Sequence, residues 1–277
     1  MEPSNTTSPK GEDTVETKRQ HFNSIHEFYR FITETSVNSV FAGKSYLASQ
    51  ETGASAIKFR GTASFQEASS LMHNGWSEMA KEIDGRLRTE IKSIKNQTSR
   101  RSVYDVVGGQ ASVPRYLQGV PTNMVNQKTV IKRQKVVTIN KNIGYNCNVK
   151  KETMIQESIK ALKIIREIEA SGTRVNLNIV WTTTSGNETI IMSVRIKSAG
   201  ERLNIAKMAF PLVHPSMLRR IAFRYIETSK LITEHSFTYG YGRSEDGLAV
   251  SKHLPKDEIF LPSFIPNPQA VVDQIKK

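Results

Sequence analysis

The sequence contains a single cysteine, Cys147, among its 277 residues. One thiol excludes an internal disulfide and a zinc cluster built from cysteines, and it is typical of a reducing compartment. No stretch approaches the roughly 18 to 20 uncharged apolar residues of a membrane-spanning helix. Residues 1–14 also lack the basic start and apolar segment of a secretory signal. We therefore expect a cytoplasmic protein without membrane contact.

The sequence patterns of common catalytic sites are missing as well. There is no HExxH, GxSxG, EF-hand or GxxxxGK[ST] pattern. Cys147 has no histidine nearby in the sequence, which disfavours nucleophilic catalysis. The sequence favours a non-enzymatic protein with no cofactor or metal. A hydrolase or nuclease stays open as an alternative, because distant segments could still bring carboxylates together.

Positive charge is abundant and unevenly distributed. The formal net charge is +13 and the isoelectric point is near 9.8, which favours contact with polyanions. Residues 81–135 hold twelve Lys or Arg against four Asp or Glu, a net of +8. The candidate anion or nucleic-acid contacts in this region are Lys92, Lys95, Arg100, Arg101, Lys132 and Arg133, with Tyr104 and Tyr116 available for stacking. The alternative is that these cations only solvate a helix and two surface loops.

Apolar spacing divides the chain into a helical N-terminal region and an α/β region. Residues 1–13 are polar and predict a disordered tail. Within 15–35, apolar residues recur at steps of three and four, which predicts one helix. The segment 99–125, with paired glycines and two prolines, predicts largely irregular structure with short extended pieces around Val103 to Val107. We place the helical region, with its basic irregular segment, at residues 14–124 and the α/β domain at 125–277.

Residues 135–181 predict a strand, a helix and a second strand. KVVTI is a compact β-branched run, and the segment 150–172 places Ile155, Ile159, Leu162, Ile165 and Ile168 on one helical stripe. TRVNLNIVW then alternates apolar and polar residues, as a strand does. Such βαβ units are usually parallel, so we expect an α/β fold: a βαβ-containing sheet flanked by helices, Rossmann-like in its layering. The strand at 189–196 is expected at an edge.

The loop INKNIGYNCN, residues 139–148, is the candidate binding site of this unit. It follows the first strand, and open α/β sheets bind ligands at the carboxyl ends of strands. Its candidate binding residues are Asn140, Lys141, Asn142 and Asn146. Their amides and amine suit neutral or anionic groups, although they could instead stabilise their own turns.

The stretch HPSMLRRIAFRYIE, residues 214–227, offers two further candidates. On a helical wheel Arg220 and Arg224 lie four residues apart, on the side opposite the apolar stripe, with Glu227 nearby. The pair could bind a phosphate or a partner carboxylate. An exposed pair bridged to Glu227 is the commoner outcome, and His214 is interpreted as a helix-terminal hydrogen-bonding residue.

Three stretches, GTASFQEASSLMHNGW (61–76), GGQASVPRYLQGVPTNM (108–124) and MAFPLVHPSMLRRIAF (208–223), carry a family resemblance. They resemble a family of phage and prophage proteins known as a domain of unknown function, over about residues 57–265. The resemblance implies an origin in a mobile element and expression inside a bacterial host. It carries over no reaction.

The unit 135–181 also looks like the opening of a von Willebrand factor A domain, in which a metal-binding DxSxS motif follows the first strand. The matching positions are Asn140 to Gly144. The aspartate is missing and Lys141 stands within the motif. Because a lysine repels a divalent cation, the resemblance implies a fold without its metal site.

These observations favour a phage-type binding or assembly module whose partner is a phage or host protein. The alternative is a nucleic-acid-binding accessory protein that uses the basic region at 81–135.

Overall fold

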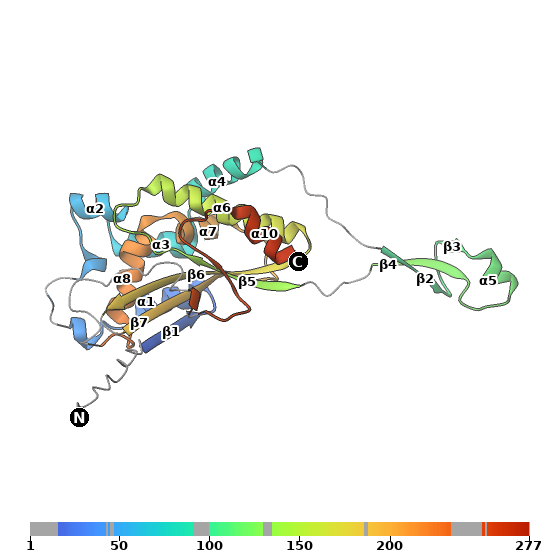
Figure 1. Cartoon of the computed structure of the whole chain (residues 1–277), viewed down its shortest axis with the longest axis horizontal. Coiled ribbons are helices and arrows are strands. Elements are labelled where there is room, and N and C mark those ends of the chain that lie inside the picture. Colours follow the sequence, from blue (N-terminus) through green and yellow to red (C-terminus); the bar gives the residue numbers. More distant parts are fainter. Residues whose placement is uncertain are drawn as a thin grey trace, which may run out of the picture.

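Five strands form the central sheet, in the order β1-β7-β6-β5-β8 (Figure 1). The computed structural model describes residues 16–42, 44, 47–90, 100–129, 135–185, 188–233, 251–252 and 254–276. The strands are β1 (Glu16–Phe22), β5 (Val136–Asn142), β6 (Arg174–Ser185), β7 (Glu188–Lys197) and β8 (Ile259–Leu261). All neighbours are parallel except β6 and β7. The α/β prediction is therefore confirmed.

The βαβ unit lies where the sequence predicts it. Helix α6 (Lys151–Ala170) joins β5 to β6, which run parallel from Val136 opposite Arg174 to Asn142 opposite Val180. The five residues of the predicted helical stripe are all buried. The helix ends before Gly172, whose φ of 91° is a conformation that glycine adopts without strain.

Helices pack on one another and on the apolar face of the sheet. They are α1 (Ile25–Glu34), α2 (Ala54–Arg60), α3 (Phe65–Asn74), α4 (Ser77–Glu90), α7 (Ile205–Val213), α8 (Ala222–Thr228) and α10 (Pro268–Lys276). Two 3-10 turns, Ser39–Phe41 and Ala48–Gln50, and a π-helical segment, Met217–Ile221, complete the helical part. Figure 1 shows α4, α6, α7 and α10 along the same side of the sheet, and α6 contacts the other three. One apolar core results.

The prediction of one helix over residues 15–35 is wrong for its first half. Residues up to Phe22 form β1, and α1 begins only after Ser24. Ser24 Oγ accepts from the Glu27 amide, and Glu27 accepts from the Asn23 amide, a capping box that starts the helix here. The apolar spacing misleads because Phe22 packs beside Phe28, with ring centroids 5.0 Å apart, although the two lie in different elements.

Strand β1 also changes the organisation of the sheet. It covers the outer edge of β7, so the strand expected at an edge lies inside the sheet. The N-terminal region is thus less helical than predicted. The boundary between residues 124 and 125 remains a prediction, although the sheet takes strands from both sides of it.

Residues 100–129, which we call the arm, form a second, three-stranded sheet. β2 (Arg100–Asp105) and β3 (Gln110–Ala111) both pair antiparallel with β4 (Met124–Thr129), and α5 (Val113–Leu117) lies between β3 and β4. Much of the segment predicted as irregular is therefore ordered. Gly108 permits this pairing, because a Cβ there would lie 2.4 Å from the Val125 carbonyl oxygen. Figure 1 shows the arm set apart from the five-stranded sheet.

The position of Phe22 yields a stability prediction. Its ring is buried against Phe28, Phe31 and Tyr225, so Phe22→Ala should lower the free energy of unfolding by about 3 to 5 kcal/mol. Ile57→Ala, at an exposed position of α2, is the control and should cause a much smaller change. Urea unfolding measures both, and equal losses would contradict the packing of β1 on α1.

Candidate functional site

The carboxyl ends of β5 and β8 form the position where an open α/β sheet would bind a ligand. The loop after β5 and residues 262–265 after β8 leave the same edge of the sheet, because the two strands are parallel. Ser263 Oγ donates to the Gly144 carbonyl at 2.7 Å, and the Tyr145 hydroxyl donates to the Ser263 carbonyl at 3.2 Å. These hydrogen bonds connect the loop after β5 to the segment after β8.

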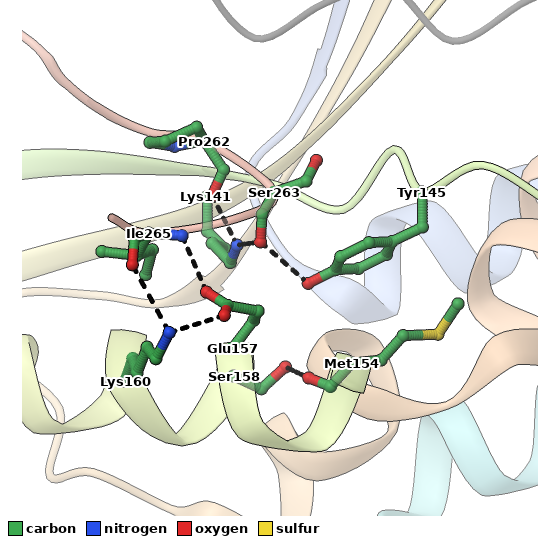
Figure 2. A network of polar contacts seen from close by, with 9 residues as sticks. All are labelled: Lys141, Tyr145, Met154, Glu157, Ser158, Lys160, Pro262, Ser263 and Ile265. Carbon is green, nitrogen blue, oxygen red and sulfur yellow. Dashed lines mark hydrogen bonds and ion pairs between the residues drawn. The ribbon is translucent and has the colours of Figure 1, made fainter. Parts of the chain in front are cut away.

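Lys141, near the end of β5, lies beside these two connected segments. Strand alternation places it on the helix-covered face with Ile139, and its side chain is fully buried. Figure 2 shows the ammonium group between the carbonyls of Pro262 and Ser263, to which Nζ donates at 2.7 and 2.8 Å. The lysine thus binds the segment after β8 instead of reaching solvent.

A buried carboxylate lies on the other side of the same segment. Glu157 of α6 accepts from the Ile265 amide at 2.7 Å and from Lys160 Nζ at 2.7 Å (Figure 2). Burial lowers the pKa of Lys141 to about 7, an effect that the charge of Glu157 opposes and that of Lys160 reinforces. Burial also raises the pKa of Tyr145.

Little space is left for a substrate beside these groups. A cavity lined by residues that include Tyr145, Met154 and His214 has a volume of about 10 Å³, room for at most one water molecule. Lys141 could exchange a proton near neutral pH, but its hydrogen bonds all lead to backbone oxygens. The cluster therefore connects β5, α6 and the segment after β8.

The four predicted loop residues do not converge. Asn140 lies on the opposite face of the sheet from Lys141, donates to Glu258 at 2.6 Å and accepts from Asn178 at 2.9 Å. The Asn142 side chain accepts from the amide of Gly144, within its own turn. Asn146 is the exposed member of the set.

Sequence reasoning missed a polar row on that opposite face. His21 Nδ1 lies 2.5 Å from Ser193 Oγ, and Arg195 Nε donates to Asn178 at 3.4 Å. His21 is half-buried, and burial followed by the charge of Arg195 lowers its pKa. The signal was the alternation of polar residues in β6, which marks a second face but does not name its partners.

The prediction of an exposed Arg220–Arg224 pair is wrong. In the π-helical segment each turn takes up more residues than an α-helix, which the helical wheel does not represent. Arg220 is fully buried and donates to the carbonyls of Ser49, Glu51 and Thr62 at 2.8, 3.1 and 2.9 Å. Arg224 Nε donates to the Ile32 carbonyl at 3.1 Å.

Two further polar residues of the stretch at 214–227, Glu227 and His214, are also buried. Glu227 is buried and accepts from the Ser49 amide at 2.9 Å and from the Ser49 hydroxyl. His214 accepts from the Ser216 amide at 3.0 Å, and burial lowers its pKa to about 4. The stretch at 214–227 therefore packs into the core, and of the expected arrangement only the approach of Arg224 to Glu227, at 3.9 Å, is present.

The basic region contributes its candidates through the arm. Lys92, Lys95, Lys132 and Arg133 lie outside the described residues. Arg100 and Arg101 belong to β2, although only their backbone is described. Tyr104 and Tyr116 are both exposed, and the Arg115 guanidinium lies 4.1 Å from the centre of the Tyr104 ring.

The arm also exposes most of the large apolar side chains found at the surface. Ten are exposed among the described residues, and six of them belong to the arm: Tyr104, Val106, Val107, Val113, Tyr116 and Leu117. No residue from 102 to 127 is buried. Sequence analysis found the two tyrosines but not the apolar tip, because it predicted an irregular segment here.

Comparison with known proteins identifies the family. A family model described as "Domain of unknown function (DUF7192)" matches residues 5–277. The chain belongs to this family. The match extends beyond the region of resemblance predicted from the sequence and confirms membership of a domain family of unknown function. No curated protein and no solved structure matches this member of the family.

Two searches of the described residues complete the picture. None of the helices there is long and apolar enough to cross a membrane. Nor does that part of the chain hold a group of three or more His, Cys, Asp or Glu that could bind a metal ion.

Lys141 predicts a distinct pH dependence of stability. Its pKa is about 7 in the folded protein against an ordinary value of 10.5, so between these pH values the unfolded chain binds the proton more tightly. Raising the pH from 7 therefore adds stability, by up to about 1.4 kcal/mol per pH unit. Lys141→Met should flatten this slope, as measured by urea unfolding at pH 7, 8 and 9. Lys58→Met, on the exposed face of α2, should keep it. Equal slopes in all three proteins would show that burial does not lower the pKa of Lys141 in the folded protein.

Arg220 predicts a large loss of stability on substitution. Arg220→Met leaves three buried carbonyls without their donor, which should lower the free energy of unfolding by about 3 kcal/mol or more. Arg30→Met, which removes an exposed ion pair with Glu34, is the matched control and should be nearly neutral. If the two variants unfold at the same urea concentration, the hydrogen bonds of Arg220 are not a major source of stability.

Proposed function

We propose that this protein is a non-enzymatic binding and assembly module in which the arm recognises the partner. The observation that carries the proposal is the inverted burial of the arm: residues 102–127 include no buried residue, yet they expose six large apolar side chains. Exposed large apolar side chains concentrated in one small part of a protein often mark an interaction site.

The energetics of a small sheet support this role. Three short strands gain independent stability from an apolar face that is buried against something else. In the arm, Leu117 is 78% and Val107 72% exposed, so most of that stabilisation is still to be gained. Each such side chain contributes roughly 1.5 to 3 kcal/mol when it is fully buried, and a partner could supply that burial.

The described residues outside the arm, which we call the body, support recognition by serving as a scaffold. Three of the body's buried or half-buried carboxylates among the described residues belong to separate hydrogen-bond sets: Glu157 binds the Ile265 amide, Glu227 binds Ser49, and Glu258 binds Asn140. A hydrolase or nuclease would require such groups to converge on one substrate. The polar groups at the ends of β5 and β8 are likewise bonded to one another.

The proposal includes a phage or mobile-element origin and action in the cytoplasm of a bacterial host, on a phage or host protein. It further takes the region from residue 125 as a von Willebrand A-like domain that has lost its metal site. In support, a helix joins the parallel strands β5 and β6, and β7 turns back antiparallel. Lys141 provides an internal cation next to the position of the lost motif.

The proposal predicts that complex formation depends on the arm. Full-length protein from a lysate of infected cells should elute in a complex larger than a monomer by size exclusion with light scattering. A chain with residues 102–127 replaced by a Gly–Ser linker should elute as a monomer. The double variant Val107→Ser, Leu117→Ser should lose most of the complex, whereas Ile57→Ser, an exposed apolar position of the body, should retain it. Recovery of the full-length protein as a free monomer would overturn the proposal.

A further inference from the structure

Positive charge is concentrated around the arm. Residues 91–135 contain nine Lys or Arg and one acidic residue, Asp105, a net of +8 out of +13 for the whole chain. The other 232 residues therefore share a net of only +5. The arm itself holds four of the nine basic residues against Asp105, a net of +3. A second copy of the same arm would be repelled by this charge.

Strand register brings like charges together at the base of the arm. Arg101 of β2 is directly opposite Lys128 of β4, and Arg100 pairs with the neighbouring Thr129. Like charges at opposed positions destabilise an antiparallel pair. An anion bound between them removes that cost, so this register favours a polyanionic partner.

The far end of the arm has the opposite character. Val106 and Val107 follow β2, and Tyr116 and Leu117 end α5, all of them exposed. Proteins that bend nucleic acids insert apolar side chains of this kind between base steps, and exposed tyrosines stack on unpaired bases.

The geometry between base and tip suits one extended ligand. The six residues of β2 span roughly 20 Å, more than the depth of a duplex groove of about 8 Å. Cations at the base could therefore lie on phosphates while the tip reaches the bases. Arg115 adds a guanidinium near the tip, held over the Tyr104 ring and donating to the Thr122 carbonyl at 3.3 Å.

From these observations we infer that the arm binds nucleic acid. The cations at its base neutralise phosphates, and the apolar tip with Tyr116 contacts bases. This inference goes beyond the proposed function, whose partner is a phage or host protein, because it gives the arm a nucleic-acid ligand as well. An apolar protein groove would account for the tip alone, whereas a nucleic acid accounts for both the tip and the opposed cations.

The test is fluorescence anisotropy of the full-length protein with labelled 30-nucleotide probes: single-stranded DNA, duplex DNA, single-stranded RNA and duplex RNA. Affinity for at least one probe should fall steeply between 50 and 200 mM salt. The ranking of the four probes identifies the form that the arm prefers.

Two arm variants separate the roles. Arg101→Gln with Lys128→Gln should lower the magnitude of the salt slope by up to about 2, because two phosphate contacts are lost. Tyr116→Ser with Leu117→Ser should weaken binding by about 5- to 100-fold and leave the slope unchanged. Lys58→Gln with Lys230→Gln, two exposed cations of the body, is the control and should match the parent. Circular dichroism and thermal melting check that each variant keeps its fold.

Absence of binding to all four probes at 50 mM salt would overturn the inference, as would binding that neither arm variant weakens. If an arm-dependent complex from the lysate survives nuclease treatment while all four probes fail, the partner is a protein. The inference then fails and the proposed function stands. If the complex is also missing, both fail.

Discussion

Buried cations bound by backbone carbonyl oxygens hold the body together. Lys141 joins β5 to the segment after β8, and Arg220 joins the π-helical segment to the chain between Ser49 and Thr62. A buried ammonium or guanidinium is costly unless its donors are satisfied. Each cation therefore fixes the position of the backbone that solvates it. The bonds of Lys141 add to the pairing of β5 with β8, where Lys141 is opposite Leu261. The segments that Arg220 joins are far apart in the sequence and are not paired in a sheet.

The arm distributes its residues in the opposite way. In the body, buried cations such as Lys141 and Arg220 donate to backbone oxygens, although Arg220 Nε has no hydrogen-bond partner. In the arm, apolar groups lie outside without a core. The first arrangement gives the body a self-sufficient interior. The second arrangement leaves the arm dependent on a partner to bury its apolar side chains. Because the two occur in one chain, we assign stability to the body and recognition to the arm.

Periodicity predicted the elements whose environment is uniform along their length. Helix α6 and its flanking strands could be recognised because Ile155 to Ile168 keep one face buried over the whole helix. Residues 15–35 were misread because Phe22 and Phe28 share one core from two different elements. Arg220 was misplaced because the wheel assumes 3.6 residues per turn, and nothing in the sequence announces a π-helical segment.

The candidate site was harder to predict than the fold. The sequence placed Lys141 in a binding loop after the first strand, whereas it lies inside β5. Its partners are backbone oxygens of Pro262 and Ser263, which have no sequence signature. Asn140 and Asn142 were grouped with it by proximity, although strand alternation separates their faces. In the arm, the short strands and the close approach at Gly108 became visible only with the pairing of β2 and β4.

The pairing of Arg100 with Thr129 means that the ribbon starts and ends at one place. An element attached in this way is an insertion between α4 and β5 whose two ends lie side by side. Its length and tip could change from one family member to another without altering the register of the central strands. A change confined to the arm would thus leave the central framework as it is.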